Sequence, residues 1–170
     1  MTEQKSLGVY PPYFNKYISL VETEDLSSIL EKQINEVSEF FNSVPEDKWL
    51  YKYEENKWTI KEVLQHITDT ERVFSFRALA FARKDPNNFP SFNENEYAKN
   101  SHADNRNPKD LIEEFLAVRK SSQLLFKSFS PSQMETVGKA SNNEMSVNAI
   151  GYMIAGHFQW HLNILKERYL

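Results

Sequence analysis

Helical periodicity is the feature that most constrains the fold of this sequence. Four segments carry apolar residues at every third or fourth position, the spacing of one face of an α-helix. They cover residues 24–43, 60–83, 108–129 and 146–168. The chain has only four glycines in 170 residues, which is few for a β-rich domain with many tight turns. The pattern therefore predicts an all-α domain, a four-helix bundle.

Helix-start signals support these boundaries. Thr59, with Glu62 three residues later, forms a capping box before the second segment. Asn107 and Pro108 supply an N-cap and a proline at the first helical position of the third segment. Ser146 is a suitable N-cap for the last segment.

The connections between the predicted helices differ from those of a plain up-down bundle. Residues 84–107 and 130–145 far exceed the roughly 2–8 residues that usually join neighbouring helices. They are long enough for a crossover and for a wall over a site. Residues 1–22 are expected to lie as an arm over the bundle, within a single domain that spans residues 1–170.

Charge and hydropathy argue against several classes of partner. The formal net charge is −4 and no run of Lys and Arg occurs, so nucleic acid and membrane surfaces are not expected partners. The longest apolar stretch, residues 150–156, is far shorter than the ~20 residues that span a bilayer. The first residues lack the basic and apolar segments of a signal peptide, which predicts a cytoplasmic protein. We expect a small-molecule substrate.

The sequence contains no cysteine. A disulfide framework is therefore excluded, and so is a protein thiol acting as nucleophile, redox centre or metal ligand. Any metal ion must be bound by His, Asp or Glu.

Two histidines, His157 and His161, lie in the middle of the apolar face of the last predicted helix. Four residues apart on a helix, both rings can reach one point, as paired zinc ligands do. The alternative is that both are core histidines hydrogen-bonded to other helices. A metal needs at least a third ligand. His66, beside the apolar face of the second predicted helix, is a better candidate than His102, which lies in a polar loop.

Several other residues bear on the chemistry. Phe158 stands where a zinc metalloprotease has the Glu that follows its first His, so peptide hydrolysis of that type is not expected. Glu71, on an apolar face, could be a general base, a fourth ligand or a support for the ligands; alternatively, it pairs with an Arg. Arg77 could bind a substrate anion or pair with an acidic residue of a neighbouring helix. Asp69 is expected at the surface, paired with the arm or with Arg72.

The 84–107 connection contains two aromatic residues of interest, Phe92 and Tyr97. A connection of this length in a compact domain usually has a function. We predict that both rings fold back to wall the mouth of the metal pocket. The alternative is that the connection only covers a hydrophobic seam.

Two stretches, KWTIKEVLQHITDTERVFSFRALAFAR and IAGHFQWHLNILKERYL, together resemble the DinB/YfiT-like family of metalloenzymes. The resemblance extends over nearly the whole chain, and its most specific element is one His on the second helix combined with the G-H-x-x-x-H pair on the last. It implies a bundle with a non-simple crossover, often a homodimer. It also implies a divalent metal, usually Zn or Ni, held by His66, His157 and His161. Characterised relatives include S-transferases that use bacillithiol and a mycothiol-dependent isomerase, while many members are described as hydrolases.

These observations lead to three functional hypotheses. The first is a metalloenzyme that activates a low-molecular-weight thiol for transfer to a small electrophile, in a pocket bordered by Ile150, Met153 and Ile164. The second is a metal-dependent hydrolase, for which Glu71 is the candidate base. The third is a non-catalytic helical bundle whose metal is structural or absent.

Overall fold

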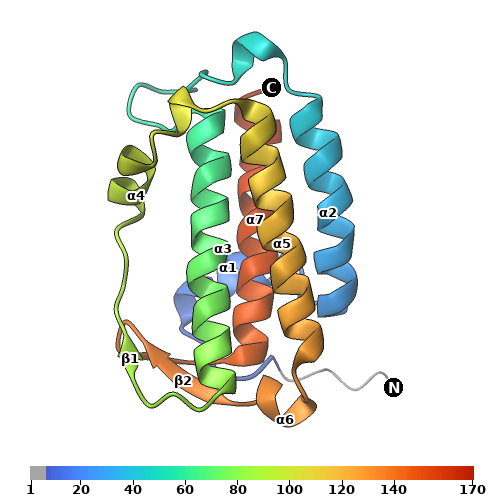
Figure 1. Cartoon of the computed structure of the whole chain (residues 1–170), viewed down its shortest axis with the longest axis vertical. Helices are drawn as coiled ribbons and strands as arrows, with labels where there is room; N and C mark the ends of the chain where they lie inside the picture. Colours follow the sequence, from blue (N-terminus) through green and yellow to red (C-terminus); the bar gives the residue numbers. More distant parts are fainter. Residues whose placement is uncertain (1–6) are drawn as a thin grey trace.

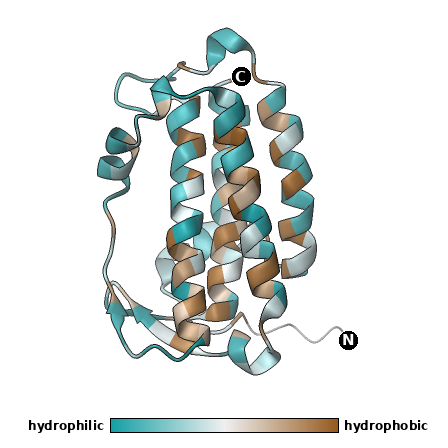
Figure 2. Ribbon diagram, in the orientation of Figure 1, coloured by the Kyte–Doolittle hydropathy of each residue, from teal (hydrophilic) through white to brown (hydrophobic). Residues whose placement is uncertain are grey.

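The computed structural model describes residues 7–170 and shows four long helices packed as a bundle (Figure 1). The predicted fold class is confirmed, and the ends of the long helices differ from the predicted ones by at most two residues. These helices are α2 (Leu26–Asn42), α3 (Ile60–Ala82), α5 (Pro108–Ser128) and α7 (Val147–Arg168). Most of their apolar residues are buried inside the bundle, although Phe76 and Leu124 are exposed. Figure 2 shows apolar and polar segments alternating along the helices.

The bundle does not have simple up-down connectivity. Around the bundle the order is α2, α5, α3, α7, so α2 and α3, which are consecutive in the chain, lie diagonally opposite each other. Helices α3 and α5 run in the same direction, and the connection between them returns along the whole length of the bundle (Figure 1). This is the crossover that the length of residues 84–107 predicts.

Side-chain caps fix where the helices begin. Thr59 Oγ1 accepts a hydrogen bond from the Glu62 backbone N–H at 3.0 Å, and Glu62 Oε2 accepts one from the Thr59 N–H at 2.9 Å. This reciprocal pair satisfies two of the N–H groups that a helix start leaves without partners. Ser146 Oγ likewise accepts from the Ala149 N–H at the start of α7.

The two long connections meet in a small sheet that periodicity did not predict. Strands β2 (Val137–Ala140) and β3 (Asn143–Ser146) form an antiparallel hairpin, and β1 (Asn88–Phe89) pairs with β2 in parallel. The connections also contain the short helices η3 (Ala103–Asn105), α4 (Glu94–Ser101) and α6 (Pro131–Met134). The hairpin turn, Ser141-Asn142, has φ values of 53° and 62°. Its residues lack the Asn-Gly or Asp-Gly signature of such a turn, and the strands are too short to show alternation.

The described part of the arm packs against the last helix. Its elements are η1 (Pro12–Phe14) and α1 (Asn15–Ile18). The first six residues of the predicted arm lie outside the described residues. A further short helix, η2 (Glu46–Lys48), lies outside the arm and follows α2. Tyr17 and Ile18 are buried. Gly156 of α7 makes this packing possible, because a Cβ on it would lie 2.2 Å from the Tyr17 carbonyl oxygen.

Replacing Gly156 by Ala should therefore push the arm away from α7. The obstacle is backbone, which cannot turn aside as a flexible side chain could, so we expect destabilisation of about 1–3 kcal/mol. Urea denaturation measures the loss, and limited proteolysis within residues 7–22 shows whether the arm has moved. Glu167→Ala, at an exposed position of the same helix, is the control for the raised helix propensity. Unchanged stability and protease resistance of Gly156→Ala would contradict this packing.

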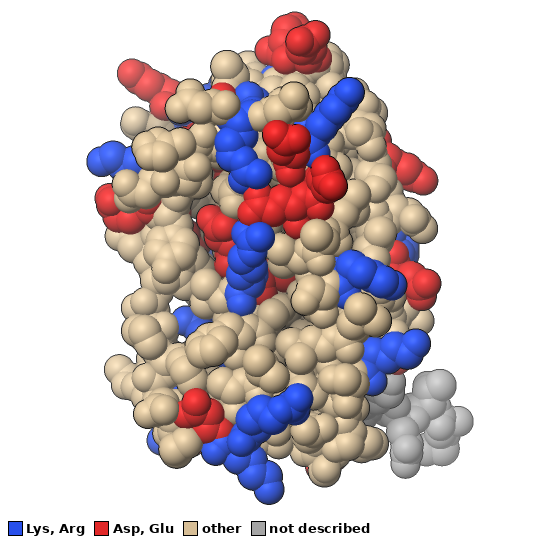
Figure 3. Space-filling view, viewed as in Figure 1, with Lys and Arg blue, Asp and Glu red and all other residues tan. Residues whose placement is uncertain are grey.

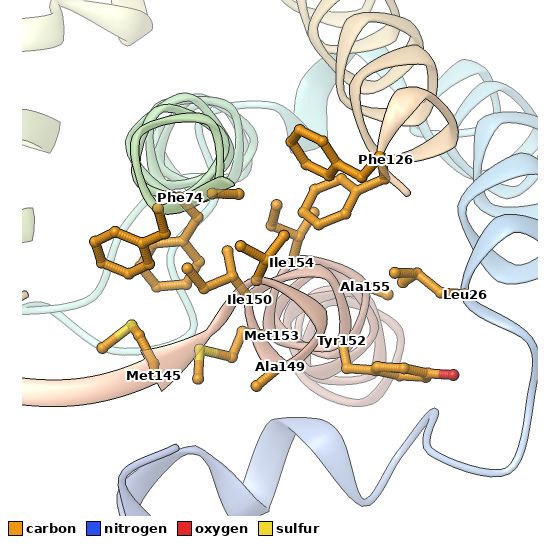
Figure 4. Close-up of a cluster of buried hydrophobic side chains, with 14 of the residues drawn as sticks. Leu26, Phe74, Phe126, Met145, Ala149, Ile150, Tyr152, Met153, Ile154 and Ala155 are labelled. Atoms are coloured by element: carbon orange, nitrogen blue, oxygen red, sulfur yellow. The ribbon is translucent and has the colours of Figure 1, made fainter. Parts of the chain in front are cut away.

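The core consists of two apolar clusters with a buried polar layer between them. One cluster surrounds the first half of α7, where Ile150 and Ile154 lie between Phe74 and Phe126 (Figure 4). The other surrounds its second half and includes Phe41 and Phe115. The polar layer crosses all four long helices and consists of Gln33, His66, Glu71, Arg119 and His157. No helix within residues 7–170 has both the length and the apolar character to cross a membrane.

Candidate metal centre

The three predicted ligands come together where α3 packs against α7. His66 Nε2 lies 3.0 Å from His157 Nε2, and His161 Nε2 lies 3.1 Å from the same atom. One ring nitrogen from each histidine falls within 4.8 Å of the others. His66 and His157 are buried and His161 is half-buried. The structure thus shows that α3 and α7 pack against each other, which the spacing of the histidines alone could not establish.

The arrangement of the nitrogens fits a divalent cation better than it fits hydrogen bonds. The Nε2 of a neutral imidazole carries either one proton or one lone pair, so that of His157 cannot make good bonds to both neighbours. Three lone pairs directed at one ion would satisfy all three rings. Nitrogens about 2.0–2.1 Å from a tetrahedral zinc ion lie about 3.3 Å apart, close to the two separations of 3.0 and 3.1 Å to His157 Nε2. Thr70 Oγ1 lies 3.5 Å from His66 Nδ1 and can accept its proton, which leaves the Nε2 lone pair for a metal.

Burial keeps all three imidazoles neutral at physiological pH. Desolvation lowers the pKa of His66 to about 4. It also lowers the pKa of His161 to about 3, where the nearby charges of His66 and Lys16 add to the effect. The pKa of His157 falls well below its usual value, again chiefly through burial. Neutral imidazole is the form that binds metal ions.

The lowered pKa values should make the metal-free protein sensitive to acid. The unfolded chain takes up these protons near pH 6.5, whereas the folded chain takes them up only near pH 4 at His66 and pH 3 at His161. Between these values the unfolded state binds more protons, so the stabilisation is complete above pH 6.5 and is lost as the pH falls. We expect the Tm of chelated protein to fall steeply over this range. The double variant His66→Gln, His161→Gln should show a clearly shallower fall, and parallel profiles would contradict the assignment.

A cavity of about 250 Å³ opens beside His157. Its walls come from the arm, from α3, from the start of the 84–107 connection and from the hairpin turn. The lining residues are Tyr13, Phe14, Tyr17, Thr70, Phe74, Arg77, Ser91, Phe92, Glu94, Ser141 and His157. A larger cavity of about 720 Å³, between the starts of α2 and α7 and the end of α5, shares none of these residues.

The walls of the smaller cavity differ from those expected. Phe92 lines it, but Tyr97 packs on Phe92 with ring centroids 5.2 Å apart and remains 47% exposed outside. Ile150, Met153 and Ile164 do not line it, because they point into the two apolar clusters.

Aromatic residues that the sequence analysis did not single out surround the site. The Tyr17 ring meets that of His157 edge-on at 5.3 Å, and the Trp58 ring lies 4.5 Å from that of His66. A signal for the first contact was present, since a glycine directly before His157 on a buried helix face indicates that another segment approaches closely. Nothing comparable pointed to Trp58.

Glu71 is not part of the histidine cluster. Of the alternatives predicted for Glu71, the structure shows the ion pair with an arginine. Arg119 Nε donates to Glu71 Oε1 at 2.9 Å and to Oε2 at 3.1 Å, and a terminal nitrogen of Arg119 donates to Oε2 at 2.9 Å. Arg119 is fully buried between the rings of Phe115 and Phe158. It also donates to the Gln33 side chain, and Gln33 in turn donates to the Ala155 carbonyl of α7.

The remaining candidates lie as follows. Arg77 is buried and donates to the Pro90 carbonyl at 2.7 Å, and none of the ion pairs within residues 7–170 involves it. Asp69 is half-buried rather than fully at the surface; it accepts a hydrogen bond from Gln65 and lies 3.7 Å from Arg72, one of its two predicted partners. His102 is exposed beyond the end of α4 and is not part of the histidine cluster.

Fold and site together define an all-α bundle protein with a three-histidine cluster between two of its helices. The family model of the DinB superfamily matches residues 29–165, and the chain belongs to this superfamily. Among solved structures, it is similar to YfiT from Bacillus subtilis, with a TM-score of 0.62 and 12% sequence identity over 94% of this chain and 89% of that one. YfiT is described as a probable metal-dependent hydrolase with an unusual four-helix bundle topology. No curated protein matches the sequence significantly.

Proposed function

We propose that this protein is a metal-dependent enzyme that transfers a low-molecular-weight thiol to a small electrophile. His66, His157 and His161 would hold the divalent ion, for which Zn and Ni are the candidates. The observation that carries the proposal is the convergence of three neutral imidazole nitrogens beside a cavity. Such a donor set leaves positions open for a substrate, as catalytic zinc sites do.

The neutrality of the ligands determines the chemistry that the site would support. A divalent ion held by three neutral histidines keeps its full charge and so lowers the pKa of a thiol or water molecule bound to it. The thiol would release its proton to solvent, its sulfur would form a bond to the electrophilic carbon, and the leaving group would depart with its electron pair. The aromatic walls, including Tyr17 and Phe74, would exclude water from the electrophile.

The surroundings of Glu71 favour a thiol over water as the nucleophile. Hydrolysis gains from a general base next to the attacking water, but both oxygens of Glu71 are engaged by Arg119. In the described part of the chain, no carboxylate joins the histidine cluster. A thiol needs no such base, because its proton is much more acidic than that of water.

Metal-dependent hydrolysis is the second candidate. It is supported by the likeness to YfiT, which is described as a probable hydrolase of this kind. The same three histidines would serve it, with water in place of the thiol.

Activity measurements separate these functions. Metal-loaded protein should accelerate the conjugation of chlorodinitrobenzene with at least one member of a panel of small cellular thiols. The rate should be lost on chelation and in His157→Ala but kept in His102→Ala, which alters a histidine outside the cluster. Metal-dependent cleavage of nitrophenyl esters without any thiol would instead support the hydrolase. Bound metal with neither activity would support a non-catalytic bundle.

A further inference from the structure

We infer that Arg77 binds the carboxylate of a substrate at the end of the small cavity away from the histidines. The inference rests on the proposed function in one respect: the end of the substrate opposite its carboxylate would reach the metal ion. The binding of the carboxylate itself depends only on residues of the cavity.

The position of Arg77 suits the far end of an elongated ligand. The backbone of Arg77 follows that of His66 on the same helix by eleven residues, about 16 Å along the axis at 1.5 Å per residue. Thr70 and Phe74 lie between them and also line the cavity. The guanidinium of Arg77 lies 5.6 Å from the centroid of the Phe74 ring. Arg77 and His157 both line the cavity, so a single molecule can contact the guanidinium and the histidine cluster.

The guanidinium of Arg77 has donors to spare. It carries five N–H groups, and the Pro90 carbonyl accepts from one of its nitrogens. The side chain is only 5% exposed and, within residues 7–170, forms no ion pair. Burial lowers the pKa of Arg77, but an arginine remains a cation at neutral pH. A buried cation without an anion is costly, and a bound carboxylate would remove that cost.

A carboxylate fits this cavity better than a phosphate does. The planar guanidinium matches the two oxygens of a carboxylate. Among the lining residues Arg77 is the single side chain that is cationic at neutral pH, and the exposed Glu94 would repel a dianion more strongly than a monoanion. The other polar groups of the lining are neutral: the imidazole of His157 and the hydroxyls of Tyr13, Tyr17, Thr70, Ser91 and Ser141.

The remaining walls indicate the body of the substrate. Five aromatic rings line the cavity, from the arm, from α3 and from the 84–107 connection. Flat apolar groups pack favourably on such rings. The volume of about 250 Å³ limits the ligand to a small molecule. The substrate class is therefore a small carboxylic acid with an aromatic or otherwise apolar body.

The test compares three ligands of similar shape by isothermal titration calorimetry: phenylbutanoate, phenylbutanamide and phenylpropylphosphonate. We expect the carboxylate to bind roughly 10- to 100-fold more tightly than the amide, the range for a hydrogen-bonded charged group. The phosphonate should bind more weakly than the carboxylate. The preference for the carboxylate should persist in chelated protein and disappear in Arg77→Met, while the affinity for the amide stays unchanged.

Controls make each outcome decisive. Arg83→Met, an exposed position at the end of the same helix, should keep the preference. If Arg77→Met does not fold, Arg77→Lys should show a reduced preference, because it keeps the charge but loses the planar pair of donors. Any of four results would overturn the inference: equal affinities for the carboxylate and the amide, no measurable binding, tighter binding of the phosphonate than of the carboxylate, or a preference for the carboxylate that survives Arg77→Met. A preference lost on chelation would place the carboxylate on the metal and overturn it too. Absence of turnover would refute the proposed function alone.

Discussion

Elemental analysis of the purified protein should find a single divalent ion per chain, and replacing His66, His157 or His161 by Ala should remove it. Each substitution deletes one of three convergent nitrogens, and the two that remain do not make a site that retains metal through purification. We expect the affinity to fall by several orders of magnitude. Measurement of bound metal after dialysis against a weak chelator gives the result directly.

The matched control for this prediction is His102→Ala. It removes an exposed histidine outside the cluster, so the metal content should stay at the level of the unaltered protein. A site emptied by His102→Ala but filled in His66→Ala would show that the ligands are assigned wrongly. Circular dichroism on the same samples should show that each variant keeps its helical content, because two large apolar clusters hold the fold.

Arg119→Met should lower the free energy of unfolding by about 3–5 kcal/mol. The substitution leaves the carboxylate of Glu71 buried without its partner and removes the donor to Gln33. This loss is a large part of the total stability of an ordinary domain, about 5–15 kcal/mol. Urea denaturation of the metal-free protein measures it without a contribution from bound metal.

A second substitution tests whether the loss of stability in Arg119→Met comes from the unpaired, buried carboxylate of Glu71. The double variant Glu71→Leu, Arg119→Met removes both charges and should recover most of the lost stability, since apolar replacements of a buried pair are often neutral or better. Arg72→Met is the exposed control, and its effect should stay within about 1 kcal/mol. Arg72 is exposed and pairs with the half-buried Glu114 and Asp69. The face of the molecule in Figure 3 carries charges of both signs. Equal stability of the single and double variants would argue against this explanation.

The long helices and the histidine cluster could be predicted because both depend on regular spacing. A helix turns by a fixed angle at each residue, so the apolar faces and the pair His157–His161 follow from the sequence. His66 required one more step, the assumption that its helix packs against the last one. The structure meets that assumption, since α3 and α7 are neighbours in the bundle.

The buried face of α5 shows where spacing misleads. Val118 and Leu125 continue the apolar spacing of this helix, but both are only half-buried, whereas Arg119 is fully buried. A prediction of buried positions from the spacing of apolar residues assigns a charged side chain such as Arg119 to the solvent-exposed face of the helix. Only its distant partner, Glu71, makes burial of the arginine possible, and no local pattern reveals such a pair.

The aromatic walls of the small cavity were missed for a similar reason. They depend on how the arm and the 84–107 connection fold back over α3, which neither segment encodes by periodicity. Phe92 could be anticipated from the length of its connection, whereas Tyr13 and Phe14 could not.

The polar layer has a consequence for how this bundle finds its arrangement. Apolar helices can slide past one another by a turn, about 5.4 Å, and still bury similar surfaces. Here such a slip would separate Arg119 from Glu71 and move Gln33 away from the carbonyl of Ala155. A slip between α3 and α5 would bury unpaired charge, and a slip of α2 would break the buried hydrogen bonds of Gln33, so one register is favoured over the others. The polar layer thus sets the axial alignment of all four helices, and this alignment places His66 of α3 beside His157 of α7.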